Sequence, residues 1–163
     1  MQTVELHPSV AAALKQCGIV HEVMECDPNL ADTAAFCEHY KFRADETCNA
    51  IIAASKTDPI KYACCLVLAT CKVDVNRKVC ELLSVKRCSF ASAEQTLELT
   101  GMMIGGVTPP GVPDMPIYID AAVMQNQRVV IGGGNRSTKI LLNPHELLKL
   151  PHAEAIDQLG LPR

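Results

Sequence analysis

Two apolar runs around a short polar turn constrain the fold of this chain more than any other feature. Residues 50–54 are Ala-Ile-Ile-Ala-Ala, residues 60–68 are Ile-Lys-Tyr-Ala-Cys-Cys-Leu-Val-Leu, and the polar segment 56–59 separates them. Runs of this kind predict a β-hairpin. The strongly apolar stretch 63–71 is about half as long as a membrane span requires, so we interpret it as a buried strand.

Capping residues and hydrophobic periodicity predict the other elements. Helices are expected at 8–17, 32–39, 74–83, 92–100 and 146–150, and strands at 19–26, 117–119, 128–131 and 138–142. A long loop is expected over 105–116, which holds four of the ten prolines and three of the nine glycines. Helices and strands do not alternate regularly, which favours an α+β architecture with a mixed sheet over a doubly wound fold.

Composition limits the partners that such a domain can bind. The 163 residues carry a net charge of −3 and contain no Trp, three Phe and three Tyr. The chain therefore lacks the overall basic field that duplex binding requires, and a nucleic-acid partner would need a local patch. The cations that could follow a phosphate backbone are scattered along the sequence, at Lys41, Arg43, Arg77, Lys78, Lys86, Arg87, Arg136 and Lys139.

Nine cysteines are an unusually high number for this length, and all lie between Cys17 and Cys88. No C-x-x-C pair occurs, so a structural metal site has little support. The first residues lack the features of a secretory leader, so we expect free thiols in a reducing, cytoplasmic compartment. Most of these cysteines are predicted to be small core residues, and thiol redox chemistry or metal binding is the alternative.

Two glycine-rich segments are candidate functional loops. Gly132-Gly133-Gly134 follows a predicted strand, but no helix follows, so it predicts a glycine turn rather than a dinucleotide loop. Arg136 and Lys139, after this turn, are either phosphate contacts or solvated surface charges. The segment 105–111 combines glycines with prolines and could hold several backbone N–H groups around one concavity, as in an oxyanion hole.

Taken in order, four segments resemble the YbaK/EbsC family, free-standing relatives of the editing domain inserted in bacterial prolyl-tRNA synthetase. They are Thr100 to Gly111, Ile119 to Ala121, Val130 to Arg136 and Leu141 to Leu148. The resemblance extends over roughly His7 to Leu150. It implies one domain over 1–163, with a core at about 7–150 and a C-terminal tail at 151–163. The implied fold is a YbaK-like α/β domain with a mixed, partly barrel-like central sheet surrounded by helices.

The resemblance also implies a function. Members of the family deacylate wrongly charged tRNA, commonly tRNA for proline carrying a small amino acid, and the backbone of a G-x-x-x-P motif holds the aminoacyl ester. The matching residues here are Gly105 to Pro109. A family lysine stands near the start of the strand after the second helix, and Asn49 replaces it in this sequence.

We therefore expect a cytoplasmic, trans-acting aminoacyl-tRNA deacylase that needs no metal or cofactor and binds neither membrane nor DNA. Its partner is the aminoacylated 3′ end of tRNA, with an aminoacyl-tRNA synthetase as a second candidate. The expected catalytic residues are Asn49, Gly105 and Gly106. Substrate contacts are expected from Val107, Thr108, Pro109, Asp120, Gly132, Gly133, Gly134, Asn135 and Arg136.

Two alternatives stay open at this point. Asp120 either binds the substrate amine or fixes the loop through hydrogen bonds. Because Asn49 replaces the family lysine, the chain could instead be a binding module for aminoacyl-tRNA or a synthetase that no longer hydrolyses the ester.

Overall fold

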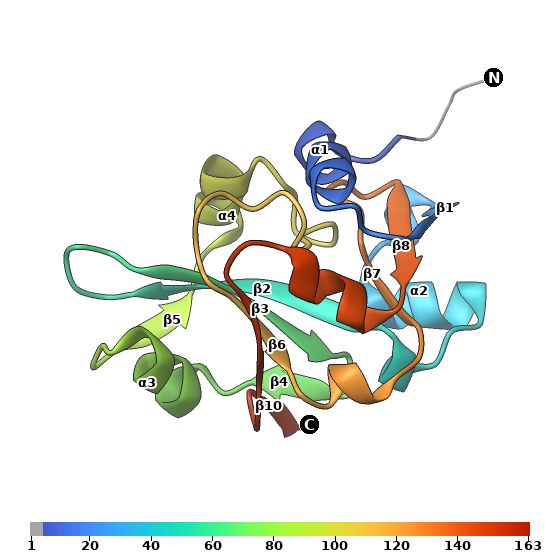
Figure 1. Cartoon of the computed structure of the whole chain (residues 1–163). Helices are drawn as coiled ribbons and strands as arrows, with labels where there is room; N and C mark the ends of the chain where they lie inside the picture. The colour runs from blue at the N-terminus through green and yellow to red at the C-terminus, as the bar shows by residue number, and fades with distance from the viewer. Residues whose placement is uncertain (1–4) are drawn as a thin grey trace.

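A five-stranded mixed sheet organises the fold of residues 5–163, which the computed structural model describes (Figure 1). The strand order is β5-β2-β3-β6-β9; β5, β2 and β3 are antiparallel, and β3, β6 and β9 are parallel. The strands are β2 (Cys48–Ser55), β3 (Tyr62–Leu68), β5 (Cys88–Phe90), β6 (Ile117–Asp120) and β9 (Ala153–Ile156).

The predicted hairpin forms the centre of this sheet. β2 and β3 pair antiparallel, with Ile51 opposite Cys65. Successive side chains of β3 point to opposite faces, so Cys64 and Leu66 enter one hydrophobic core while Cys65 and Val67 enter another. Burial on both faces explains why this strand is a continuous apolar run instead of an alternating one.

Three further strands form a second, antiparallel sheet in the order β1-β8-β7. They are β1 (Glu22–Glu25), β7 (Val129–Gly132) and β8 (Thr138–Leu142). A single parallel bridge between Thr47 and Val130 joins this sheet to the start of β2. The predicted mixed α+β architecture is therefore confirmed, although the strands do not close into a barrel.

The helices lie outside the sheets, as expected (Figure 1). They are α1 (Pro8–Gln16), α2 (Thr33–Tyr40), α3 (Cys80–Leu83) and α4 (Ala93–Thr100). The capping box predicted at the start of α4 is present, because Ser92 accepts from the Gln95 N–H and the Gln95 side chain accepts from the Ser92 N–H.

Two of the predicted helices differ in type from the expectation. The segment predicted as one helix over 74–83 is a π-helical turn, Val75–Val79, that continues into α3, because the Val79 N–H bonds to the carbonyl of Asp74, five residues back. The last predicted helix is a 3₁₀ helix, Pro144–Lys149. Further 3₁₀ turns lie at Pro28–Leu30, Ala44–Glu46 and Val123–Gln125.

The C-terminal segment, expected to follow the core as a tail, contributes two strands. β9 pairs in parallel with β6, and β10 (Gly160–Pro162) pairs with β4 (Cys71–Val73). Between β9 and β10, Leu159 is fully buried in the core that contains Val67. Residues 153–156 and 160–162 are short and lack a run of β-branched residues, so local patterns do not predict these strands.

All nine cysteines are free thiols, and six of them are buried. Burial raises the pKa of Cys64 to about 12 and that of Cys88 to about 11, and it also raises the pKa of Cys26, Cys48 and Cys65. The interpretation of most cysteines as core residues is confirmed. Within residues 5–163, no helix has both the length and the apolar character that crossing a membrane requires.

These burial differences predict the thiol reactivity of the native protein. At pH 8 a thiol with a pKa of about 11 is roughly one part in a thousand thiolate, and buried sulfur also excludes the reagent. We expect a thiol-reactive chromophore to modify only the partly exposed Cys17, Cys37 and Cys71 quickly, and all nine cysteines after denaturation. Cys71→Ser should reduce the fast phase from three thiols to two, and fast reaction of the buried thiols would contradict this assignment.

Candidate active site

A pocket of about 200 Å³ opens between β2, α4, the start of α2 and the loop that follows α4. Polar and apolar groups are mixed in its wall. Asn49 and Gly105, which are far apart in sequence, both line it. The residues that line it are Asp32, Thr33, Asn49, Ala50, Ile51, Ile52, Ala91, Thr96, Ile104, Gly105 and Val107.

A smaller cavity of about 50 Å³ adjoins this pocket and shares five wall residues with it. Its remaining wall comes from Cys48, Gly132 and Lys139, on β2, β7 and β8. Both sheets therefore contribute to the site, and the bridge between Thr47 and Val130 holds them together beside it.

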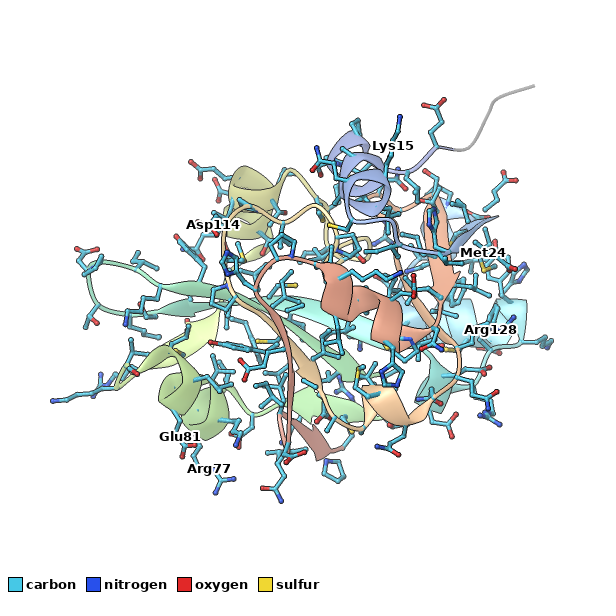
Figure 2. The ribbon with its side chains drawn as sticks, in the orientation of Figure 1. Lys15, Met24, Arg77, Glu81, Asp114 and Arg128 are labelled. Atoms are coloured by element: carbon cyan, nitrogen blue, oxygen red, sulfur yellow. The ribbon has the colours of Figure 1, made fainter. Side chains whose placement is uncertain are left out.

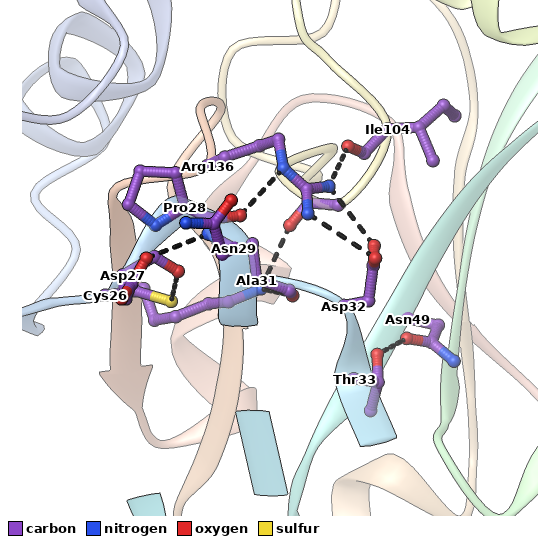
Figure 3. A network of polar contacts seen from close by, with 12 residues as sticks. Cys26, Asp27, Pro28, Asn29, Ala31, Asp32, Thr33, Asn49, Ile104 and Arg136 are labelled. Carbon is purple, nitrogen blue, oxygen red and sulfur yellow. Dashed lines mark hydrogen bonds and ion pairs between the residues drawn. The ribbon is translucent and has the colours of Figure 1, made fainter. Parts of the chain in front are cut away.

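Asn49 is oriented by the first residue of α2. The hydroxyl of Thr33 donates to the Oδ1 atom of Asn49, and the amide nitrogen points away from Thr33 (Figure 3). An amide held in this way keeps its two N–H donors free of Thr33, whereas it offers no positive charge.

The loop from Ile104 to Val107 presents main-chain groups to the same pocket. The Gly106 N–H donates to the carbonyl of Met103, whereas the N–H groups of Gly105 and Val107 make no hydrogen bond within residues 5–163. Gly105 has a φ of +93°, a backbone conformation that residues other than glycine rarely adopt. The loop therefore carries two backbone donors that the fold does not use.

Arg136 holds this loop against the segment before α2 (Figure 3). Its guanidinium donates to the carbonyl oxygens of Ile104 at 2.9 Å and Pro28 at 3.1 Å, and to the carboxylate of Asp32 at 3.1 and 3.4 Å. The hydrogen bond from Arg136 lowers the pKa of Asp32, so this carboxylate stays ionised at neutral pH. Asp32 therefore pairs with Arg136 instead of capping α2 through its side chain.

Lys139 makes a second connection between the same two segments, from a buried position in the middle of β8. Its ammonium donates to the carbonyls of Ala31 at 2.9 Å and Gly105 at 3.0 Å, and lies 5.3 Å from the centre of the Phe36 ring. Burial lowers the pKa of Lys139. Arg136 and Lys139 were expected to be either phosphate contacts or solvated surface charges. In the structure both donate to main-chain carbonyls within the fold instead.

The glycines of the turn are required by close packing. A Cβ at Gly132 would lie 2.6 Å from the carbonyl oxygen of Gly106, and one at Gly106 would lie 2.3 Å from that of Asn135. The Gly134 N–H donates to the carbonyl of Gly106 at 2.7 Å. The turn and the loop are therefore in backbone contact, which no larger residue would permit.

The structure brings four of the predicted site residues to the pocket, namely Asn49, Gly105, Val107 and Gly132. The other predicted residues lie behind this wall or further away. Thr108 and Pro109 are buried, and the Thr108 hydroxyl has no partner within residues 5–163. Gly106, Gly133, Gly134, Asn135 and Arg136 shape and fix the loop.

Asp120 does not line the pocket. Its buried carboxylate faces the backbone N–H groups of residues 121–122 and 159–160, and Gly160 leaves space for it. Burial raises the pKa of Asp120, although these N–H groups act in the opposite direction. This geometry gives Asp120 a structural position, but its partners lie in the C-terminal segment and the residues that follow β6, not in the loop that it was expected to fix.

Sequence reasoning missed several residues of the wall. Asp32 and Thr33, at the start of the helix expected over 32–39, have no predicted role in the site, and neither has Lys139. One signal was present for Lys139, since a lysine within the apolar strand 138–142 has to be buried and therefore needs partners. Residues 5–163 contain no group of three or more His, Cys, Asp or Glu side chains that could hold a metal ion.

Comparison with known proteins agrees with this geometry. The family described as aminoacyl-tRNA editing domain matches residues 27–150. The crystal structure of a candidate trans-editing enzyme for prolyl tRNA synthetase superposes with a TM-score of 0.78 at 24% identity, covering 94% of this chain and 98% of that one. A hypothetical protein, APE2540, gives a TM-score of 0.83 at 19% identity, covering 94% and 99%.

The match to the family model defines an aminoacyl-tRNA editing domain, and the fold is that of the matched structures. The family match covers well over half of the chain, and the chain belongs to the aminoacyl-tRNA editing domain family. The family expected from the resemblance to YbaK/EbsC proteins is confirmed.

The contact between Gly105 and Arg136 predicts the effect of a single methyl group. A Cβ at Gly105 would lie 2.2 Å from Nη1 of Arg136, so Gly105→Ala has to displace the guanidinium as well as strain the backbone. We expect a loss of about 2–4 kcal/mol in the free energy of unfolding, measured with urea. Gly18→Ala is the matched control, because Gly18 also has a positive φ but no atom lies within 4 Å of its Cβ. Its loss should be about 1 kcal/mol, and equal losses would contradict the clash.

Lys139→Met keeps the length of the side chain and removes its donors. Two buried carbonyls lose their partner, so we expect a loss of about 1–3 kcal/mol in the free energy of unfolding. Lys15→Met, on the exposed face of α1, should change it by less than about 0.5 kcal/mol.

The pH dependence of the same variant gives a second readout. The folded-state pKa of Lys139 is lowered, so the unfolded chain binds more protons between that value and the ordinary 10.5. The stability of the wild type relative to Lys139→Met should therefore rise with pH through this window and fall as the pH is lowered. A difference that stays constant with pH would show that the ammonium is not buried.

Proposed function

We propose that this protein is a trans-acting aminoacyl-tRNA deacylase that hydrolyses the ester between tRNA and a small amino acid. The observation that carries the proposal is a pocket lined by Asn49, Gly105 and Val107, in which the two loop residues have backbone N–H groups without a partner within residues 5–163. The name of the structural neighbour, a candidate trans-editing enzyme for prolyl tRNA synthetase, makes tRNA for proline the first substrate to test.

The size of the site supports a small aminoacyl group. The inner cavity of about 50 Å³ corresponds to between one and two water molecules, at roughly 30 Å³ each. A methyl, hydroxymethyl or thiol-bearing side chain fits such a space, and a larger one does not. We infer that alanine, serine or cysteine occupies the cavity while the ester lies in the wider pocket.

The proposed chemistry relies on dipoles instead of a charged nucleophile. Water attacks the ester carbonyl carbon, and the oxygen that becomes negative accepts hydrogen bonds from the amides of Gly105 and Val107 and from the side chain of Asn49. The C–O bond to the ribose then breaks, and the ribose oxygen takes up a proton, which the attacking water has released. An aminoacyl ester is already activated, so positioning and oxyanion stabilisation carry much of the rate enhancement.

The replacement of the family lysine by Asn49 favours one alternative function. The family lysine would supply a cation at this position, and an amide supplies only neutral hydrogen bonds. The second candidate is therefore a module that binds aminoacyl-tRNA, or a synthetase, without hydrolysing the ester. The proposed setting of either activity is the cytoplasm, where it would act on tRNA during translation.

A panel of charged tRNAs separates the two functions. With alanyl, seryl, cysteinyl and prolyl esters of tRNA for proline, we expect deacylation above the uncatalysed rate for the small amino acids and not for proline. Gly105→Ala should lower kcat/KM by about 100-fold, because it disturbs an oxyanion donor. Thr33→Val should lower it by about 10-fold, because the Asn49 amide is no longer held.

The matched control for these variants is Gly18→Ala, whose glycine is remote from the pocket lining. It should retain full activity. Tight binding of the same tRNAs without hydrolysis of any of them would refute the deacylase and support the binding module. Asn49→Lys then tests whether the family's cation restores turnover.

A further inference from the structure

The positive charge of this acidic protein is concentrated in one part of the chain. Residues 56–90 contain seven of the 15 Lys and Arg residues and only three of the 18 Asp and Glu residues. The rest of the chain contains eight basic and 15 acidic residues. A net charge of −3 therefore conceals a segment with a charge of +4.

The structure folds part of this segment around an open groove of about 440 Å³. The groove lies between β5, the π-helical turn that leads into α3, and the β2–β3 connection. Three cations, Lys56, Lys86 and Arg87, are its charged residues, and no carboxylate lines it. The rest of its wall comes from Val75, Asn76, Cys80, Cys88, Ser89 and Phe90.

Strand pairing places Lys56 beside Arg87, which directly follows Lys86 in the sequence. Ser55 pairs with Cys88 at the edge of the sheet, and the Lys56 N–H donates to the carbonyl of Arg87 at 3.1 Å. None of the three cations forms an ion pair within residues 5–163. Adjacent like charges without a counter-charge disfavour the free protein, and an anion bound across them would remove that cost.

The groove and the candidate active site meet at the edge strand β5, since Cys88 packs into the core on one face of the sheet and Ala91 packs against the core on the other face. Phe90 lines the groove and is 45% exposed, and the next residue, Ala91, lines the pocket. The Ala91 N–H donates to the carbonyl of Ile52, which also lines the pocket, so this edge is held in place. A polyanion whose end enters the pocket would pass over Phe90 and reach the cations.

We propose that this groove binds the phosphate backbone of the tRNA acceptor arm while the aminoacylated 3′ end occupies the pocket. The inference rests on the proposed function for the identity of the RNA. Lys56, Lys86 and Arg87 neutralise successive phosphates, and the exposed ring of Phe90 offers a stacking surface to a base that leaves the helix. An acidic surface of a partner protein is disfavoured, because the groove and the ester pocket would then serve different molecules.

The test compares two variants with the same change in net charge. Lys86→Gln with Arg87→Gln removes two groove cations, whereas Lys15→Gln with Arg128→Gln removes two exposed cations elsewhere; Lys15 lies on α1 and Arg128 precedes β7 (Figure 2). Binding of uncharged tRNA for proline is measured by fluorescence anisotropy across a salt series. We expect the groove variant to raise Kd about 10-fold and to reduce the salt slope by about 1.5, while the control changes Kd less than twofold.

Kinetics with two esters separate the groove from the pocket. The ratio of kcat/KM for alanyl-tRNA to that for alanyl-adenosine should fall about 10-fold in the groove variant and stay constant in the control. Equal loss of tRNA binding in both variants, or no loss in either, overturns the proposal. Loss of association with a synthetase at unchanged tRNA affinity would overturn it in favour of a protein partner. If neither ester is cleaved, the deacylase fails, and the anisotropy series still decides the groove.

Discussion

Two buried or half-buried cations hold the site together. Arg136 and Lys139 extend from the glycine turn and β8, and both donate to main-chain carbonyls of the loop that follows α4 and of the segment before α2. Each cation is removed from water and stabilised by oxygens of the fold, with one carboxylate, Asp32, as the partner of Arg136. A charge in such a position is costly unless its partners are fixed, so the loop and the segment have one mutual arrangement.

This arrangement explains why glycine backbone forms one wall of the site. Gly105 has to adopt a positive φ beside the Arg136 guanidinium, and Gly132 has to leave space for the carbonyl of Gly106. Side chains are excluded from these positions by contact, so at this part of the wall the loop presents main-chain groups. Dipoles fixed by the fold do not have to reorient when charge develops on a bound ester, which is the physical basis of an oxyanion hole.

The sequence predicted the parts of the structure that depend on local patterns. The hairpin, α1, α4 and β8 follow from apolar runs, capping residues and glycine, and each lies close to its predicted range. Asn49, at the start of β2, and the loop 105–109 are assigned to one site only through the family resemblance. Local patterns could not reveal that Thr33 orients Asn49, that Arg136 binds inside the fold or that Asp120 faces Gly160, because each depends on contacts between distant segments.

The same limit applies to charge, and it bears on how an acidic chain could recognise RNA. The sequence shows an excess of basic residues over 56–90, but it does not show which cations are free, and Arg136 and Lys139 are as plausible a phosphate site as Lys86 and Arg87. The fold separates them by surroundings, since the first pair donates to main-chain carbonyls and to the Asp32 carboxylate, and the second stands beside Lys56 without a counter-charge. The cations that stabilise the pocket are therefore different from those available to a polyanion. A substitution in the groove would then change the affinity for tRNA without altering the geometry of the pocket residues.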